Sequence, residues 1–169
     1  MAIGSSAMCG TFKREILAGI HFWTAHTRTG SSAISADTFK IAMFTNSASI
    51  DADTTGYTTS NEVSGTGYSA GGAALASVTL GLADNSSSVP TAFLDFADTT
   101  FSSSTISNAR GALIYNSTLS TAGTGSTTNH AADPAVAVIN FGGNKSSSAG
   151  DFTIQYPAND ANNAIIRIS

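Results

Sequence analysis

The pattern of apolar and polar positions predicts one helix, close to the N-terminus. Four apolar residues recur there at the spacing of a single helical face, and they are Phe12, Ile16, Leu17 and Ile20. The charged residues 13–15 fall on the opposite side, and Thr11 is placed to cap the start of the helix. Residues 24–36 carry no periodicity, so we expect a loop after the helix.

The remaining apolar runs are short and predict strands. They lie at residues 39–44, 78–82, 92–96, 112–115, 135–141, 152–156 and 164–168. Residues 112–115 and 135–141 are apolar almost throughout, which is typical of strands buried on both faces, whereas residues 152–156 alternate and so predict one wet face. Clusters of turn-forming residues separate these runs at residues 46–49, 84–88, 102–104 and 144–150.

Short strands separated by turns, without alternating helices, indicate an antiparallel β-sandwich or jelly roll rather than a parallel α/β fold. We therefore expect a mainly β fold with one short N-terminal helix. The expected organisation is an N-terminal helix and arm at residues 1–36, followed by a β-sandwich domain at residues 37–169. Residues 118–133 are low in complexity and are expected to form an exposed loop within that domain.

Composition narrows the class of protein. Only 11% of the 169 residues are charged and the net charge is -4, whereas a nucleic-acid-binding protein needs a basic stripe. The single cysteine, Cys9, excludes an internal disulfide framework and a multi-cysteine metal site, and we expect it to be inert. No apolar run approaches the ~20 residues that span a bilayer. The sequence thus predicts no cofactor and neither a nucleic-acid nor a membrane partner.

One motif is typical of a catalytic serine. Residues 67–71 (GYSAG) fit the pattern G-x-S-x-G, and the order Ser69, then Asp95 or Asp98, then His130 is that of α/β-hydrolases. That chemistry requires a buried strand before the serine and a helix after it. Residues 61–66 are too polar for such a strand, and two consecutive glycines are a poor helix start. We therefore expect no catalytic residues and keep a small serine esterase as a remote alternative.

A second motif is similar to a calcium-binding loop. Asp51, Asp53, Gly56 and Glu62 occupy the first, third, sixth and twelfth positions of that pattern, although its fifth position is a threonine. Helices should flank such a loop, but the preceding run at residues 39–44 predicts a strand. We expect no metal site, and whether Asp51, Asp53 and Glu62 hold a cation is left open.

Four blocks of the sequence are similar to small virion structural proteins of tailed bacteriophages. They are DTFKIAMFT at residues 37–45, TSNEVSGTGYSAGG at residues 59–72, ARGALIY at residues 109–115 and FGGNKSSSAGDFTIQ at residues 141–155. The order and spacing of the blocks resemble that family from about Phe12 to the C-terminus. The segment at residues 118–133 departs from the shorter loop expected there, and contact with a neighbour or a host surface is a possible role for it.

This resemblance implies a β-rich, non-enzymatic virion subunit. Within that class we expect a capsid cement or decoration protein that stabilises the major capsid shell, made in the bacterial host cytoplasm and located on the capsid surface. A tail or head–tail junction component is the alternative. The expected partners are the major capsid protein and further copies of the chain, in a homodimer or homotrimer. Candidate contact residues are Phe12, Ile16, Leu17, Ile20 and Trp23, with packing on their own domain as the equal alternative.

Overall fold

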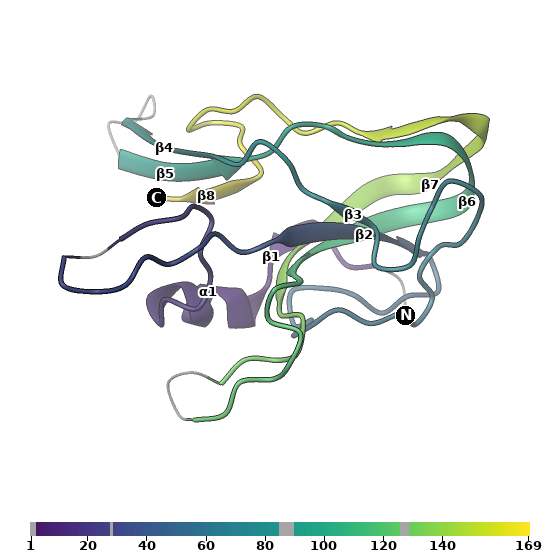
Figure 1. Ribbon diagram of the computed structural model, residues 1–169. Helices are drawn as coiled ribbons and strands as arrows, with labels where there is room; N and C mark the ends of the chain where they lie inside the picture. Colours follow the sequence, from purple (N-terminus) through teal and green to yellow (C-terminus); the bar gives the residue numbers. More distant parts are fainter. Residues whose placement is uncertain (1–2, 28, 85–89, 126–128) are drawn as a thin grey trace. The chain divides into compact units, whose positions relative to one another are not determined.

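The computed structural model describes residues 3–27, 29–84, 90–125 and 129–169 (Figure 1). The fold is mainly β, with 43% strand, 5% helix, two antiparallel sheets and one short helix near the N-terminus, which confirms the predicted class. The chain groups into two compact units. Unit 1 comprises Met1–Ala74 and Phe101–Phe152, and unit 2 comprises Leu75–Thr100 and Thr153–Ser169. In the described part of the chain, no helix is long and apolar enough to cross a membrane.

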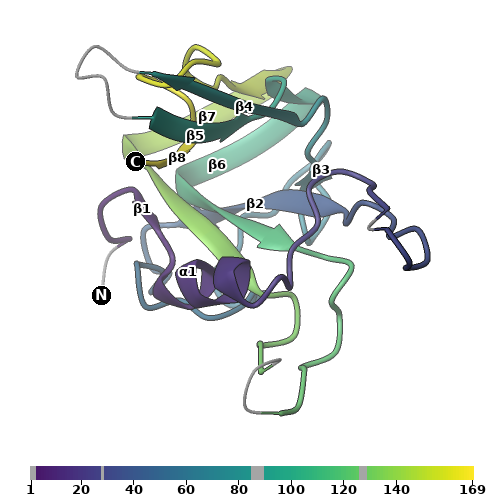
Figure 2. The same ribbon diagram turned by 90° about the vertical axis from the view of Figure 1, so that its left-hand side faces the viewer.

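Unit 1 is built on a five-stranded sheet with the strand order β1-β7-β6-β2-β3. Its elements are β1 (Ala7–Met8), α1 (Gly10–Leu17), β2 (Phe39–Thr45), β3 (Ala73–Ala74), β6 (Thr99–Asn116) and β7 (Ala135–Ile154), the last two reaching a few residues into unit 2. The long strands β6 and β7 lie side by side at its centre, with β2 beside β6 (Figure 2). Gly111–Asn116 and Ala135–Val138 are buried, as expected for strands covered on both faces.

Unit 2 contains the second sheet, which has three strands in the order β4-β5-β8. Its strands are β4 (Thr79–Asp84), β5 (Pro90–Asp95) and β8 (Ile166–Ile168). The register between β4 and β5 pairs Thr79 with Asp95 and Asp84 with Pro90 without a shift. The predicted turn at residues 84–88 lies mostly outside the described residues, and Asp84 itself ends β4.

The helix is shorter than predicted and turns a different face inward. A glycine in left-handed conformation, Gly19 (φ 67), ends it: the Gly19 N–H donates to Ile16 O, and the Ile20 N–H donates to Glu15 O. Ile20 therefore lies beyond the helix. Glu15, predicted on the solvent side, is fully buried. The predicted cap at Thr11 is also wrong, because the helix begins at Gly10, with Cys9, two residues before Thr11, at the N-cap position and no side-chain cap.

Two predicted turns lie inside strands. Residues 102–104 belong to β6, and residues 144–150 belong to β7. Ser103 (φ 49) and Ala149 (φ 50) take left-handed conformations that bend these strands without ending them. Hydroxyl groups then bond across the pair, since Ser104 Oγ and Ser147 Oγ are 2.8 Å apart. The small polar residues that suggested turns thus build one polar stretch of a long two-stranded ribbon.

Candidate interaction surfaces

The five candidate contact residues have different environments. Phe12 is fully buried in unit 1, where its ring lies 5.0 Å from that of His21 and 6.0 Å from that of Trp23. Trp23 in turn stacks on Phe39 of β2 at 3.6 Å between ring centroids. Ile16, Ile20 and Trp23 are half-buried, whereas 90% of Leu17 is exposed. Leu17 is the member of this set that α1 presents outward, and contact with another subunit stays a prediction for all five.

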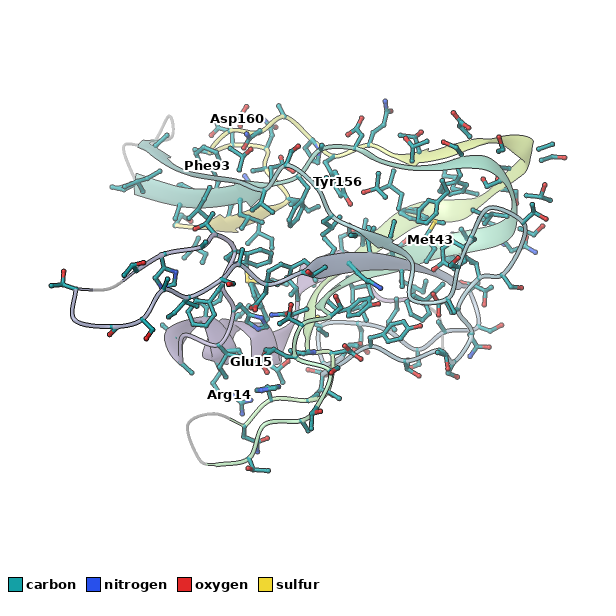
Figure 3. The ribbon with its side chains drawn as sticks, viewed as in Figure 1. Arg14, Glu15, Met43, Phe93, Tyr156 and Asp160 are labelled. Atoms are coloured by element: carbon teal, nitrogen blue, oxygen red, sulfur yellow. The ribbon has the colours of Figure 1, made fainter. Side chains whose placement is uncertain are left out.

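A buried polar network attaches the helix to the sheet. Glu15 Oε2 lies 2.9 Å from His21 Nε2, and both side chains are fully buried. On the other side of the ring, Asn116 Nδ2 donates to His21 Nδ1 at 3.1 Å and to Asp37 Oδ2 at 2.7 Å. Glu15 points into unit 1, while the neighbouring Arg14 is mostly exposed (Figure 3). These titratable groups serve packing, and no sequence spacing linked Glu15 to Asn116.

A second cluster fixes the long loop between β2 and β3. Glu62 accepts hydrogen bonds from the Tyr57 hydroxyl at 2.5 Å, the Tyr68 hydroxyl at 2.6 Å and the Gly71 N–H at 2.8 Å. Tyr115 of β6 donates its hydroxyl proton to Gly71 O at 2.7 Å and stacks on Tyr57 at 4.5 Å. Three bonds satisfy both oxygens of the carboxylate, so it is committed to holding the loop in place.

The tyrosines of this cluster are kept protonated. Burial raises the pKa of Tyr57 and of Tyr68, and the hydrogen bond that each donates to Glu62 raises it further. Burial, with the charges of Asp133 and Glu62, raises the pKa of Tyr115 to about 12. These hydroxyls therefore stay protonated near neutral pH, and none of them can act as a base there.

The serine motif does not lie in a strand–turn–helix. Ser69 is exposed and precedes a turn, and the chain then enters the two-residue strand β3 instead of a helix. His130 Nδ1 lies 2.8 Å from Ala131 O. Asp95 Oδ1 accepts from the Phe96 N–H and Asp98 Oδ1 from the Tyr156 N–H, both within unit 2. Asp95, Asp98 and His130 thus each have a bonding partner outside the proposed triad, and Ser69 is exposed.

The carboxylates of the calcium-like pattern also bond to separate partners within the protein. Asp51 Oδ1 accepts from the Asp53 N–H at 2.9 Å, while Glu62 binds the tyrosines. Among the residues that the structure describes, no three His, Cys, Asp or Glu side chains are grouped to hold a metal ion. Cys9 is buried, and burial together with Asp51 and Glu15 raises the pKa of its thiol to about 12.

Part of one apolar face of the unit 2 sheet is exposed to solvent. Paired residues in antiparallel strands share a face, and two such rows cross this sheet: Leu80, Leu94 and Ile166, then Leu82, Ala92 and Ile168. Exposed fractions reach 60% for Leu80, 74% for Leu82 and 49% for Ile168. Leu94 and Ile166 of these rows are buried, so the exposed part consists of Leu80, Leu82, Ala92 and Ile168, hereafter the β4 face. Most other large apolar side chains of the described residues are covered, which makes the β4 face their principal apolar surface besides Leu17.

No protein-family model, curated protein or solved structure matches this chain. The arrangement of its residues therefore carries the functional argument. Glu15 and His21 hold the helix in place and Glu62 holds the loop between β2 and β3, and the outward-facing apolar groups are leucine and isoleucine side chains suited to protein contacts.

Proposed function

We propose that this chain is a non-enzymatic structural subunit of a bacteriophage virion, and within that class a cement or decoration protein bound to the major capsid shell. The observation that carries the proposal is a contrast between two kinds of side chain: titratable groups that bond internally and apolar groups that are exposed. The buried Glu15 and His21 bond to each other and the half-buried Glu62 bonds to two tyrosines, while apolar residues face outward on α1 and on the β4 face.

The four sequence blocks that resemble virion proteins support the proposal through their positions. Residues 37–45 include β2, residues 109–115 belong to the buried half of β6, and residues 141–155 contain most of β7. Residues 59–72 include Glu62, Tyr68 and Gly71, which belong to the cluster that fixes the loop between β2 and β3. The resemblance thus falls on the sheet of unit 1 and on the Glu62 cluster that fixes the loop between β2 and β3. These parts stabilise the fold.

A cement protein acts by repetition. Each copy bridges adjacent capsid subunits over a modest area, and many copies together resist internal pressure through avidity. A chain with few charged residues and many hydroxyl groups serves this role, because Ser and Thr side chains form adaptable hydrogen bonds and bring no charge into the contact. The exposed Leu17 supplies an apolar anchor on unit 1.

The proposal is tested by reconstitution on capsids. Heads stripped of the chain should lose heat stability, and adding the purified chain back should restore it until the sites are saturated. Binding to tails or to the head–tail junction without binding to shells would favour the alternative location. Ester hydrolysis that disappears in Ser69→Ala would contradict the non-enzymatic proposal altogether, so a chromogenic ester is assayed in parallel.

A further inference from the structure

The β4 strand is an edge strand without the features that protect such strands. Edge strands in native proteins are kept short, charged, interrupted by proline or bulged, because their free N–H and C=O groups otherwise pair with another chain. Within the described residues, the other edges follow this rule: β1 and β3 have two residues each, and β8 has three with the exposed Arg167 at its middle. β4 has six residues and pairs with β5 without a bulge.

The side chains of β4 strengthen this contrast. Thr79–Asp84 reads TLGLAD, in which the single charge comes at the last residue and no proline occurs. Leu80 and Leu82 are 60% and 74% exposed on the same side of the strand. Gly81 lies between them on the opposite side, where the ring of Phe93 fills the space that a β-carbon would need.

From this edge we infer that the chain forms a two-fold symmetric dimer in which the β4 strands of two copies pair antiparallel about Gly81. The sequence Leu80-Gly81-Leu82 is symmetric about its glycine, so this pairing places Leu80 of one copy opposite Leu82 of the other and Gly81 opposite itself. Both phases of the hydrogen-bond ladder allow a two-fold axis at this position.

A second copy suits this edge better than an unrelated strand because of charge and continuity. Asp84 would lie opposite Val78 of the second copy, so that no two like charges face each other across the pairing. The two three-stranded sheets would join into one of six strands, and Leu80 and Leu82 of both copies would meet on one face. The inference goes beyond the proposed virion role and holds whether or not the chain binds a capsid.

Sedimentation analysis over a concentration series of the full chain tests the inference. The native chain should show a monomer–dimer equilibrium, and L80K/L82K should weaken it at least about tenfold, or about 1.4 kcal/mol. Ser107→Lys, which adds a lysine at an exposed position of β6 in unit 1, serves as the control and should leave the equilibrium unchanged. A monomer at every concentration, or a dimer that L80K/L82K leaves intact, would overturn the inference.

Cross-linking tests the register independently of affinity. A Leu80→Cys chain mixed with a Leu82→Cys chain should form a disulfide-linked mixed dimer faster than either chain does alone, because the pairing sets these two positions opposite each other. The native Cys9 is buried and should not compete. Equal rates in the mixed and single samples would contradict the proposed two-fold axis at Gly81.

Discussion

Glu62 is the side chain on which the loop between β2 and β3 depends. Its carboxylate accepts from two tyrosine hydroxyls and one backbone N–H, and hydrogen bonds to a charged group are stronger than those between neutral groups. Its position as the twelfth residue of a calcium-like pattern gave no indication of this role. Tyr57 and Tyr68 follow no sequence pattern that would assign them to it.

Glu62→Gln should lower the free energy of unfolding by about 2 kcal/mol, because the amide supplies one neutral acceptor where three donors converge. Asp53→Asn is the matched control, since it removes a carboxylate of similar chemistry from an exposed position and should change stability by less than about 0.5 kcal/mol. Chemical denaturation of both variants measures the difference. Equal effects would show that Glu62 does not anchor the loop.

All four tyrosines of the chain titrate above their ordinary range. Burial raises the pKa of Tyr57 and Tyr68, and brings those of Tyr115 and Tyr156 to about 12. In the unfolded chain the tyrosine pKa is about 10. Between this pKa and the higher pKa values of the folded chain, the folded state therefore binds more protons than the unfolded state. The stability that the four groups contribute is complete below the unfolded pKa and is lost as the pH rises through the folded values.

The chain should therefore unfold in alkali, and its tyrosinate absorbance should appear together with unfolding. Following the ultraviolet absorbance and the circular dichroism of one sample as the pH rises above about 10 checks this expectation. Tyrosinate absorbance that develops fully at the unfolded pKa, in a chain that keeps its β-sheet spectrum, would contradict the buried positions of the hydroxyls.

Among the elements, β3 depends on one glycine for its contact with β2. Gly72 has φ 69, and a β-carbon there would lie 1.8 Å from Ile41 O of β2. Gly142 in β7 has φ 73 but nothing within 4 Å of the corresponding position. The two glycines share a backbone conformation and differ in the space around them.

Gly72→Ala should destabilise the fold more than Gly142→Ala by at least about 2 kcal/mol. Both variants place alanine at a positive φ, which costs about 1–2 kcal/mol, and only Gly72→Ala adds a clash with backbone that cannot move without disturbing the sheet. Thermal unfolding of the two variants gives the comparison. If both variants lost the same stability, the close approach of β3 to β2 would be refuted.

The strands were easier to predict than the interruptions between them. The run at residues 39–44 matches β2 closely, because nearly all of its side chains are apolar and are buried in the sheet. Residues 102–104 and 144–150 were predicted as turns because Ser, Gly and Asn favour them, but cross-strand bonds such as that between Ser104 and Ser147 keep them in β6 and β7. Such bonds join residues far apart in sequence, so local composition cannot reveal them.

The prediction of which helix face is buried was wrong for a related reason. Glu15 is charged and was expected in solvent, yet the chain returns after Gly19 and brings His21 against it. The partner that makes burial of a carboxylate acceptable lies on a different element, and periodicity within the helix carries no information about it. The absence of a strand–turn–helix around Ser69, in contrast, was predictable from the polar residues before it and the two glycines after it.

At the scale of the whole molecule, Leu17 tests whether unit 1 contacts the capsid shell. If the outward face of α1 is an anchor, Leu17→Lys should weaken binding of the chain to stripped heads about tenfold, because a charged group replaces a desolvated apolar one. Ser107→Lys adds the same charge at an exposed position of β6 and serves as the control. Co-sedimentation with heads measures both, and equal binding of the two variants would remove α1 from the contact.

The number of copies per particle tests the central claim most directly. Quantitative mass spectrometry of purified virions, with the major capsid protein as the internal reference, gives this ratio. A cement protein on the capsid surface should be present in hundreds of copies and should remain on heads that lack tails. A ratio of a few to tens of copies that falls to zero on tailless heads, or a chain missing from particles altogether, would contradict the account.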